Sequence, residues 1–400
     1  MSLIEYFFGV KRMQQTIAND KNTAAPYSRT NPFHAKVLKN VNLNGASSSK
    51  ETIHIEFSLE GSGLSYVPGD ALGIIPKNDP ELVASLIKEL NWNPELEVTI
   101  NKQGETLPLR EALTTYFEIT LLSKKLLQQA AELTENEELH KLLLVENASQ
   151  LKEYCTGRDL LDMIQDFGPW KASAQEIVSM LRKMTPRLYS IASSISAHPG
   201  EVHLTIGAVR YSSHGRLRKG VCSVSVAERI QPGDSLPVFV QPNKHFHLPE
   251  SSDSDIIMVG PGTGIAPFRS FIEERAVTKA AGKTWLFFGD QHAASDFLYQ
   301  EEIEQYQKDG VITKLDTAWS RDTDQKVYVQ HKILENSKEL FSSLENGGYF
   351  YICGDKERMA KDVHNTLIEV IAKEGSMSQE EAEAYLNDLK KQGRYQRDVY

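Results

Sequence analysis

The chain has 400 residues, of which 40% are hydrophobic and 24% are charged, and this composition predicts a folded protein of two or three domains rather than a disordered one. Its 44 lysines and arginines stand against 54 aspartates and glutamates, and the resulting net charge of -10 argues against an extended nucleic-acid surface.

The cysteines and the apolar runs point to an intracellular protein without a membrane span. Cys155, Cys222 and Cys353 are far apart and form no CxxC pair for a metal or a redox disulfide. Runs such as "IIMVG" and "WLFFG" are far shorter than the ~20 residues that a membrane helix needs. We therefore predict a cytoplasmic protein with no bound metal and no nucleic-acid or membrane partner.

Residues 1–30 end in the polar, proline-containing stretch "NDKNTAAPYSRTNP", which is typical of a linker or N-terminal extension. Residues 31–250 contain short β-type runs bounded by Gly, Asn and Ser turns. These runs are "FHAKVLKNVNLN", "TIHIEFSLE" and "DALGIIP", and later "RLYSIASS", "EVHLTIGAVRY" and "SLPVFVQP". They predict an antiparallel β-barrel.

Apolar residues recur at helical spacing from about residue 79 to residue 183, inside the barrel sequence. The segments are "DPELVASLIKEL", "PLREALTTYF", "SKKLLQQAAEL" and "SAQEIVSMLRKM". Asp, Ser or Pro stands at their starts, as expected for helix N-termini. We therefore predict a helical insertion that splits the barrel in the sequence.

Residues 251–400 alternate buried strands with amphipathic helices. The strands are "DIIMVG", "TWLFFGD", "ITKLDTAWS" and "YFYICGD", with helices expected from Ala266, near Asp296, near Val329 and from Lys356. This alternation predicts a doubly wound parallel α/β sheet, which is a nucleotide-binding architecture. The last stretch, "GRYQRDVY", has the alternation of one more strand.

The segment "GPGTGIAPFRSFIEER", from Gly260 to Arg275, follows a strand and opens a helix. Its backbone amides and the helix N-terminus, around Gly262 and Thr263, suit a pyrophosphate. The spacing of Gly260, Gly262 and Gly264 is not GxGxxG, however, and we expect no carboxylate at the end of the next strand to bind an unphosphorylated ribose. Taken alone, the loop is equally well explained as a tight turn.

The segment "WSRDTDQKVYVQ" follows the third strand of this region. It carries two cations with hydroxyl and amide groups at the carboxyl end of a parallel strand, a set that suits a phosphate monoester and a stacked purine. The residues are Ser320, Arg321, Lys326, Tyr328 and Gln330. They predict NADPH rather than NADH, although an isolated charged stretch is more often a solvated loop.

A second candidate phosphate site combines "RLYSIASS", from Arg187 to Ser194, with "GVCS", from Gly220 to Ser223. Arg187 can pair with a pyrophosphate, Tyr189 can lie against a flat ring, and Ser190 can bond the edge of a flavin. Tyr189 in isolation would more often be an ordinary barrel residue, and Cys222 would simply be buried in the core.

In their order along the chain, these motifs resemble the NADPH- and FAD-binding half of the diflavin reductases, including the flavoprotein subunits of NADPH-sulfite reductase. The resemblance covers about residues 27–400 and rests on "TPRLYSIASS", "GVCS", "GPGTGIAPFRSF", "WLFFGDQH", "DFLYQEE", "WSRDTDQKVYVQ", "YICGDKERMAKDV" and "RYQRDVY". It implies a ferredoxin-NADP-reductase-like fold, with an FAD-binding barrel at 31–250, a helical connecting insertion at about 79–183 and an NADPH-binding domain at 251–400.

The resemblance also implies specific site residues. FAD would be held by Thr120, Arg187, Leu188, Tyr189, Ser190, Thr205, Ile206, Gly207, Tyr211, Gly220, Val221, Cys222 and Ser223. NADPH would be held by Ser320, Arg321, Lys326, Val327, Tyr328, Val329, Gln330 and Asp362. Tyr400 would stack on the flavin, while Ser190, Cys353 and Asp398 would surround the site of hydride transfer. A buried strand cysteine such as Cys353 is, from its position alone, usually a core residue.

Only about 25 residues precede the resemblance, too few for the FMN domain of a complete diflavin reductase. We therefore expect FAD and NADPH, but no FMN, on this chain, either because another chain carries the FMN or because the polypeptide is an engineered fragment. The expected partner is a sulfite reductase hemoprotein subunit or a separate FMN flavodoxin-like protein, within sulfur assimilation and cysteine biosynthesis. The alternatives are a stand-alone ferredoxin- or flavodoxin-NADP reductase and a non-catalytic NADP-sensing module.

Overall fold

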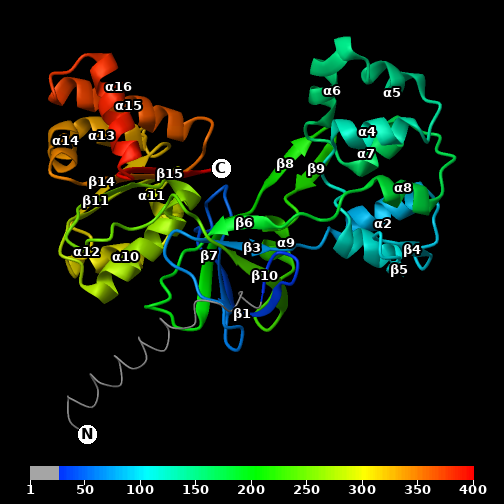
Figure 1. The fold of residues 1–400 in the computed structure, drawn as a ribbon, viewed down its shortest axis with the longest axis horizontal. Coiled ribbons are helices and arrows are strands. Elements are labelled where there is room, and N and C mark those ends of the chain that lie inside the picture. The colour runs from blue at the N-terminus through cyan, green and yellow to red at the C-terminus, as the bar shows by residue number, and fades with distance from the viewer. Residues whose placement is uncertain (1–26) are drawn as a thin grey trace, which may run out of the picture.

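The computed structural model describes residues 27–400, so most of the linker predicted over residues 1–30 lies outside the described part. Three bodies are visible in Figure 1: a barrel, a group of helices on one side of it, and an α/β unit on the other. In the described part, no helix combines the length and the apolar character needed to cross a membrane.

The barrel is an antiparallel sheet of six strands in the order β6-β3-β10-β1-β2-β7. An additional bridge from Ile191 to Leu204 brings its two ends together. β7 is buried along most of its length on both faces, because its outer face lies against the α/β unit. The strands are β1 (Phe33–Asn42), β2 (Thr52–Ser58), β3 (Ala71–Ile74), β6 (Arg187–Ser190), β7 (Glu201–Gly207) and β10 (Ser235–Gln241).

Two smaller elements accompany the barrel. Helix α9 (Ser223–Glu228) contributes Val226 to the barrel core. The hairpin of β8 (Arg210–Ser213) and β9 (Arg216–Lys219) extends from the barrel toward the helices (Figure 1). This hairpin joins the two bodies, because its arginines bond carboxylates at the start of a helix in the insertion.

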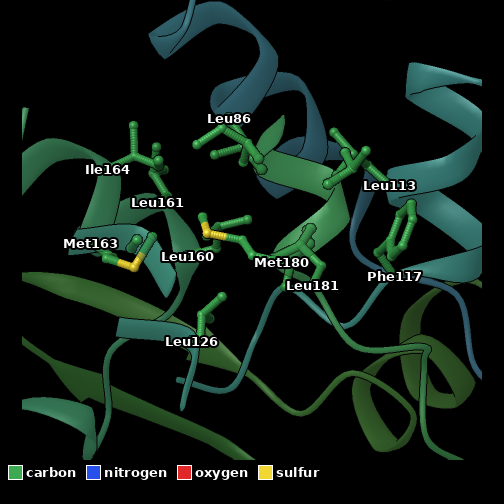
Figure 2. Close-up of a cluster of buried hydrophobic side chains, with 14 of the residues drawn as sticks. Leu86, Leu113, Phe117, Leu126, Leu160, Leu161, Met163, Ile164, Met180 and Leu181 are labelled. Atoms are coloured by element: carbon green, nitrogen blue, oxygen red, sulfur yellow. The ribbon is translucent and has the colours of Figure 1, made fainter. Parts of the chain in front are cut away.

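The segment between β3 and β6 is mainly helical. Its helices are α2 (Pro80–Glu89), α3 (Leu109–Glu111), α4 (Lys124–Ala131), α5 (Glu137–Leu142), α6 (Ala148–Cys155), α7 (Leu160–Asp166) and α8 (Ala174–Met180), with a 3-10 turn η2 (Val145–Asn147). Side chains of Asp79, Ser123 and Ser173 cap three of them, as their positions before apolar runs predict. Figure 2 shows the shared core of these helices, in which residues such as Leu86, Leu113, Leu160 and Met180 are buried.

Two local expectations for the insertion were wrong. The run "PLREALTTYF" is not one α-helix, because α3 is followed by a π-helical turn, η1 (Ala112–Tyr116). The hydroxyls of Thr114 and Thr115 donate back to the carbonyls of Arg110 and Glu111, at 2.7 and 2.9 Å. Such bonds compete with regular helical pairing. In addition, β4 (Glu97–Thr99) and β5 (Thr106–Pro108) form a small hairpin that was not predicted.

The α/β unit confirms the doubly wound parallel sheet. Its strand order is β13-β12-β11-β14-β15, and every neighbouring pair is parallel. The strands are β11 (Ile256–Val259), β12 (Thr284–Asp290), β13 (Lys314–Trp319), β14 (Tyr349–Gly354) and β15 (Tyr395–Val399). The final stretch is therefore a strand of the sheet, as its alternation predicted.

Helices cover both faces of this sheet (Figure 1). One face is covered by a short turn η3 (Gly262–Ile265), α10 (Ala266–Thr278) and α12 (Gln300–Lys308). The other is covered by α13 (Val329–Glu335), α14 (Ser337–Glu345), α15 (Met359–Glu374) and α16 (Gln379–Lys391). The helix expected near Asp296 is divided into α11 (Ala293–Asp296) and α12, and α15 begins three residues after the predicted Lys356.

Candidate active site

A large cavity lies between the barrel and the carboxyl ends of the parallel strands, where open α/β sheets bind their ligands. Its volume is 1690 Å³. A site for one small ligand or cofactor usually has about 300–1,000 Å³. The cavity is therefore large enough for two dinucleotides side by side.

The carboxylate of Asp398 joins three elements at the wall of this cavity. Asp398 lies opposite Cys353 in the register of β14 and β15. Its Oδ2 accepts a 2.5 Å hydrogen bond from the hydroxyl of Ser190, on β6 of the barrel, and lies 4.0 Å from the sulfur of Cys353. Residues that are 208 positions apart in the sequence, Ser190 and Asp398, thus meet where the two units face each other.

Burial dominates the electrostatics of this cluster. It raises the pKa of Asp398 above the usual value of an aspartate, although the bond from Ser190 opposes the shift. Burial, followed by the nearby Asp398 carboxylate, raises the pKa of the Cys353 thiol well above its usual range. Cys353 is therefore a neutral thiol that can donate to Asp398, rather than a reactive thiolate.

The final residue is held in place rather than frayed. The amide of Tyr400 donates to the carbonyl of Gly354, at 3.2 Å, and an oxygen of its α-carboxylate accepts from the amide of Lys356, at 3.0 Å. The Tyr400 hydroxyl is 2.9 Å from the hydroxyl of Thr263 in the glycine loop. Its side chain lines the cavity and is 62% exposed, so a flat surface is available to a ligand.

The loop of Gly260, Gly262 and Gly264 contains glycines in two kinds of surroundings. A Cβ on Gly264 would lie 2.2 Å from the carbonyl oxygen of Cys353, and one on Gly260 would lie 2.5 Å from the ring of Phe268. These two glycines therefore permit close packing of the loop. Gly262 is different, because it lines the cavity at a φ of +57°.

The end of β12 corrects an expectation. We expected no carboxylate at the end of the strand after the glycine loop, yet β12 ends at Asp290, which lines the cavity. Its side chain is buried and forms an ion pair with Lys50. Because the carboxylate is already paired with Lys50, a ribose would have to compete with that lysine for Asp290.

Lys50 is a cavity residue that the sequence reasoning missed. It belongs to the loop between β1 and β2, which crosses to the α/β unit. Asn44 and Ser48 of the same loop donate to Asp296, and the amide of Gly45 donates to the carbonyl of Ser295 at 2.8 Å. A single lysine in the polar stretch "NGASSSKE" carries no sequence signal for this position.

The segment after β13 has two cations without a protein partner. Arg321 and Lys326 are exposed, and among residues 27–400 neither forms an ion pair. The amides of Ser320 and Arg321 donate to the carbonyls of Asp290 and Gln291, both at 2.9 Å, which anchors the segment to the end of β12. An anchored loop with unpaired cations is a suitable environment for an anion such as phosphate.

Most of the predicted cofactor residues line the cavity. On the barrel side these are Arg187, Leu188, Tyr189, Ser190, Thr205, Gly207, Gly220, Val221, Cys222 and Ser223. On the α/β side they are Gly262, Thr263, Ser320, Val327, Tyr328, Val329, Gln330, Asp362, Asp398 and Tyr400.

Six predicted residues are outside this lining. They are Thr120, Ile206, Tyr211, Arg321, Lys326 and Cys353. The side chain of Ile206 is completely buried in the barrel core, and this burial argues against a side-chain contact with a cofactor. Tyr211 is 49% exposed on β8. The roles of all the predicted residues remain predictions.

Comparison with known proteins agrees with this architecture. A family model described as FAD binding domain matches residues 25–224, half of the chain, and one described as oxidoreductase NAD-binding domain matches residues 258–365. Three similar proteins carry the name sulfite reductase [NADPH] flavoprotein alpha-component. That of Bacillus subtilis (strain 168) is 64% identical over 94% of this chain and 62% of its own length.

The second and third relatives are less similar over comparable lengths. The protein of Klebsiella pneumoniae is 46% identical over 96% of this chain and 63% of its own length. The protein of Escherichia coli (strain K12) is 45% identical over 94% of this chain and 62% of its own length. The chain thus spans less than two thirds of the relatives that it matches.

Proposed function

The chain belongs to the FAD binding domain family and carries an oxidoreductase NAD-binding domain after it, and from this premise we propose that it is an NADPH-dependent flavoprotein reductase. The observation that carries the proposal is a cavity lined by both domains, with Ser190 of the barrel and Asp398 of the α/β unit in hydrogen-bond contact at its wall. Two cofactors bound from opposite sides would meet there.

The residues present fit FAD on the barrel side. Arg187 is a cation for a pyrophosphate, and Tyr189 offers a ring at the cavity wall. A Cβ on Gly220 would lie 2.5 Å from the hydroxyl of Ser223, so a larger residue would displace that hydroxyl from its place at the cavity wall. When bound, FAD would supply hydride acceptance and the release of electrons to an acceptor.

On the α/β side, the unpaired Arg321 and Lys326 fit the extra phosphate that distinguishes NADPH from NADH. Ser320 and Gln330, which line the cavity, add neutral hydrogen-bonding groups. This donor set supports NADPH as the electron donor.

The chain's own residues would then orient the reaction. Asp398 Oδ2 holds the hydroxyl proton of Ser190 and places negative charge at the cavity wall, which favours a nicotinamide ring that becomes cationic. The thiol of Cys353 adds a neutral donor behind the carboxylate. Tyr400 would cover the flavin and exclude water until the nicotinamide displaces its ring.

The relatives' names support sulfite reduction as the wider role. We propose that electrons leave this chain for a sulfite reductase hemoprotein subunit or for a separate FMN flavodoxin-like protein. A stand-alone reductase of ferredoxin or flavodoxin would share the chemistry, but the helical insertion is the feature that favours the diflavin group.

Reduction of ferricyanide tests the proposal. The chain, loaded with FAD and freed of excess cofactor, is expected to reduce ferricyanide with NADPH. A chain that remains colourless after incubation with FAD would refute the flavoprotein assignment. A yellow chain without turnover would favour a binding module. A pull-down with the hemoprotein and flavodoxins of the same organism would then identify the acceptor.

A further inference from the structure

A buried carboxylate lies beside the cavity residues of the barrel. The side chain of Glu118, which follows η1, is 0% exposed. A buried carboxylate is costly unless it is paired and hydrogen-bonded. The hydrogen-bond partners of Glu118 therefore indicate which residues it positions.

Both of its oxygens are bound, and both partners are residues expected to hold FAD. Oε2 accepts from Nη2 of Arg187 at 3.0 Å. Oε1 accepts from the amide of Thr120 at 3.0 Å and from its hydroxyl at 2.5 Å. Burial acts to raise the pKa of Glu118, but the bonds from Thr120 and Arg187 hold it below the usual value, so the group is charged.

These contacts determine which N–H groups of Arg187 remain available. Thr185 accepts two bonds from Nη1 of Arg187, through its carbonyl and its hydroxyl, both at 2.6 Å. A guanidinium has five N–H groups, and three of them are now bound. The remaining two, on Nε and Nη2, have no partner among the described residues, and Arg187 lines the cavity. That pair of donors matches two oxygens of one phosphate.

The same carboxylate determines how Thr120 can act. A hydroxyl has one proton to donate, and that of Thr120 is given to Glu118. Toward a ligand, Thr120 can therefore only accept a hydrogen bond. Groups that can donate to it on a dinucleotide are the ribose hydroxyls and the adenine amino group.

We propose that Glu118 is a positioning residue for FAD, which fixes Arg187 so that its two remaining N–H groups are available to the pyrophosphate and fixes Thr120 as an acceptor for the adenosine part. The proposal rests on the FAD-binding function. Glu118 is not among the cavity-lining residues, and its effect passes through Arg187 and Thr120.

A double-mutant cycle tests the proposal through FAD affinity, measured by titration of the flavin-free chain. Glu118→Gln keeps the shape but loses the charge, and we expect it to weaken FAD binding about tenfold, comparable to one charge-assisted hydrogen bond. In the Arg187→Ala background, the same change should weaken FAD binding clearly less, because Thr120 is then the only group left for Glu118 to position. Glu118→Asp should restore part of the affinity.

Glu105→Gln is the matched control, because Glu105 is an exposed carboxylate of the same insertion that bonds Asn101. It should leave FAD affinity unchanged. An equal loss in both backgrounds, or no loss in either, would overturn the proposal and leave Glu118 with a purely structural role. If the Glu118→Gln variant fails to fold, Glu118→Asp in the two backgrounds gives the same comparison. If the wild-type chain binds no FAD, the proposed function itself fails.

Discussion

At the scale of single residues, the arrangement around Asp398 explains why a strand ends the sheet with a carboxylate and an aromatic ring. The hydroxyl of Ser190 and the sulfur of Cys353 both face Asp398 Oδ2. Such a cluster places one negative charge at a defined point of the cavity, and two neutral donors keep it there.

The first prediction concerns the charge of Asp398. Because burial raises its pKa, the carboxylate should become protonated at a pH above the usual value for aspartate. The rate of flavin reduction should therefore fall as the pH falls through that raised pKa. Asp398→Asn should be slow at every pH, lack this acid limb and still bind FAD. Anaerobic stopped-flow measurement of flavin bleaching checks both effects.

Asp388→Asn is a suitable control for this experiment, because Asp388 is an exposed carboxylate on α16 that pairs with Lys391. It should retain the wild-type pH profile. If Asp398→Asn instead reduced its flavin at wild-type rates, the terminal strand would be structural only.

The second prediction concerns the choice of nucleotide. Arg321→Ala combined with Lys326→Ala should raise the KM for NADPH much more than the KM for NADH. A lost charge-assisted contact to phosphate costs about 1.5–3 kcal/mol, or one to two decades of affinity. Steady-state kinetics with both nucleotides measures the ratio.

Lys332→Ala provides the comparison, because Lys332 belongs to the neighbouring helix α13 but is already paired with Glu335. It should change neither KM. Equal increases for NADPH and NADH in the double variant would remove the assignment of the phosphate site.

At the scale of elements, the hairpin of β8 and β9 is attached to the insertion through a buried ion cluster. Arg218 bonds Asp159 at 2.7 Å and Asp162 at 2.9 Å, and all three side chains are buried. Arg216 contributes a second guanidinium to the same carboxylates. Asp159 and Asp162 also cap α7, so the cluster connects a helix N-terminus to the barrel.

The third prediction follows from this cluster. Arg218→Met should destabilise the protein by about 3–5 kcal/mol, because it leaves buried carboxylates with too little positive charge. Adding Asp159→Asn and Asp162→Asn should recover part of the loss. Urea unfolding measures both variants. A single variant as stable as wild type would show that the cluster adds no net stability.

The elements also show how far the sequence could be interpreted. The order of the strands, the insertion and the final strand followed from apolar periodicity, because the segments concerned bury regular faces. The π turn η1 and the hairpin of β4 and β5 did not, because they depend on local threonine bonds and on three-residue strands.

The site was predictable only in part, because some of its residues act on partners that are far away in the sequence. Motifs around Arg187 and Arg321 are contiguous in sequence, so their residue types could be identified directly. Lys50 and Glu118 act on partners 240 and 69 positions away, Asp290 and Arg187. Such pairings appear only when the chain is folded.

At the scale of the whole molecule, the barrel and the α/β unit meet through buried polar groups. The hydroxyl of Tyr299 is 2.9 Å from Nδ1 of His54 and 2.6 Å from the hydroxyl of Thr205. Arg269 donates to the carbonyl of Ala192 at 2.7 Å and pairs with Glu273. Polar contacts of this kind set the relative position of the units, and hence the shape of the cavity.

The fourth prediction is a pH dependence of stability that arises at this contact. Burial, followed by the positive charges of Arg269 and His198, lowers the pKa of His203 from 6.5 to about 3. Between pH 6.5 and pH 3, His203 is therefore protonated in the unfolded chain but neutral in the folded chain. The free energy of unfolding consequently falls with decreasing pH. This residue alone accounts for roughly 1–2 kcal/mol between pH 6.5 and pH 5.

Two other histidines modify this dependence. Burial also lowers the pKa of His54, which adds to the effect, whereas the bond to Glu273 raises the pKa of His198, which opposes it. Glu56 and Glu201 face the same rings. His203→Gln should flatten the slope of unfolding free energy against pH, measured by urea unfolding. An unchanged slope would show that His203 is not the responsible group.

The central claim is that NADPH and FAD meet in the cavity between the two units. Anaerobic mixing of the FAD-loaded chain with NADPH, followed by flavin absorbance, tests it most directly. We expect the bound flavin to bleach, and to bleach faster than with the same concentration of NADH. A chain that holds FAD but whose flavin stays oxidised in the presence of NADPH would contradict the claim.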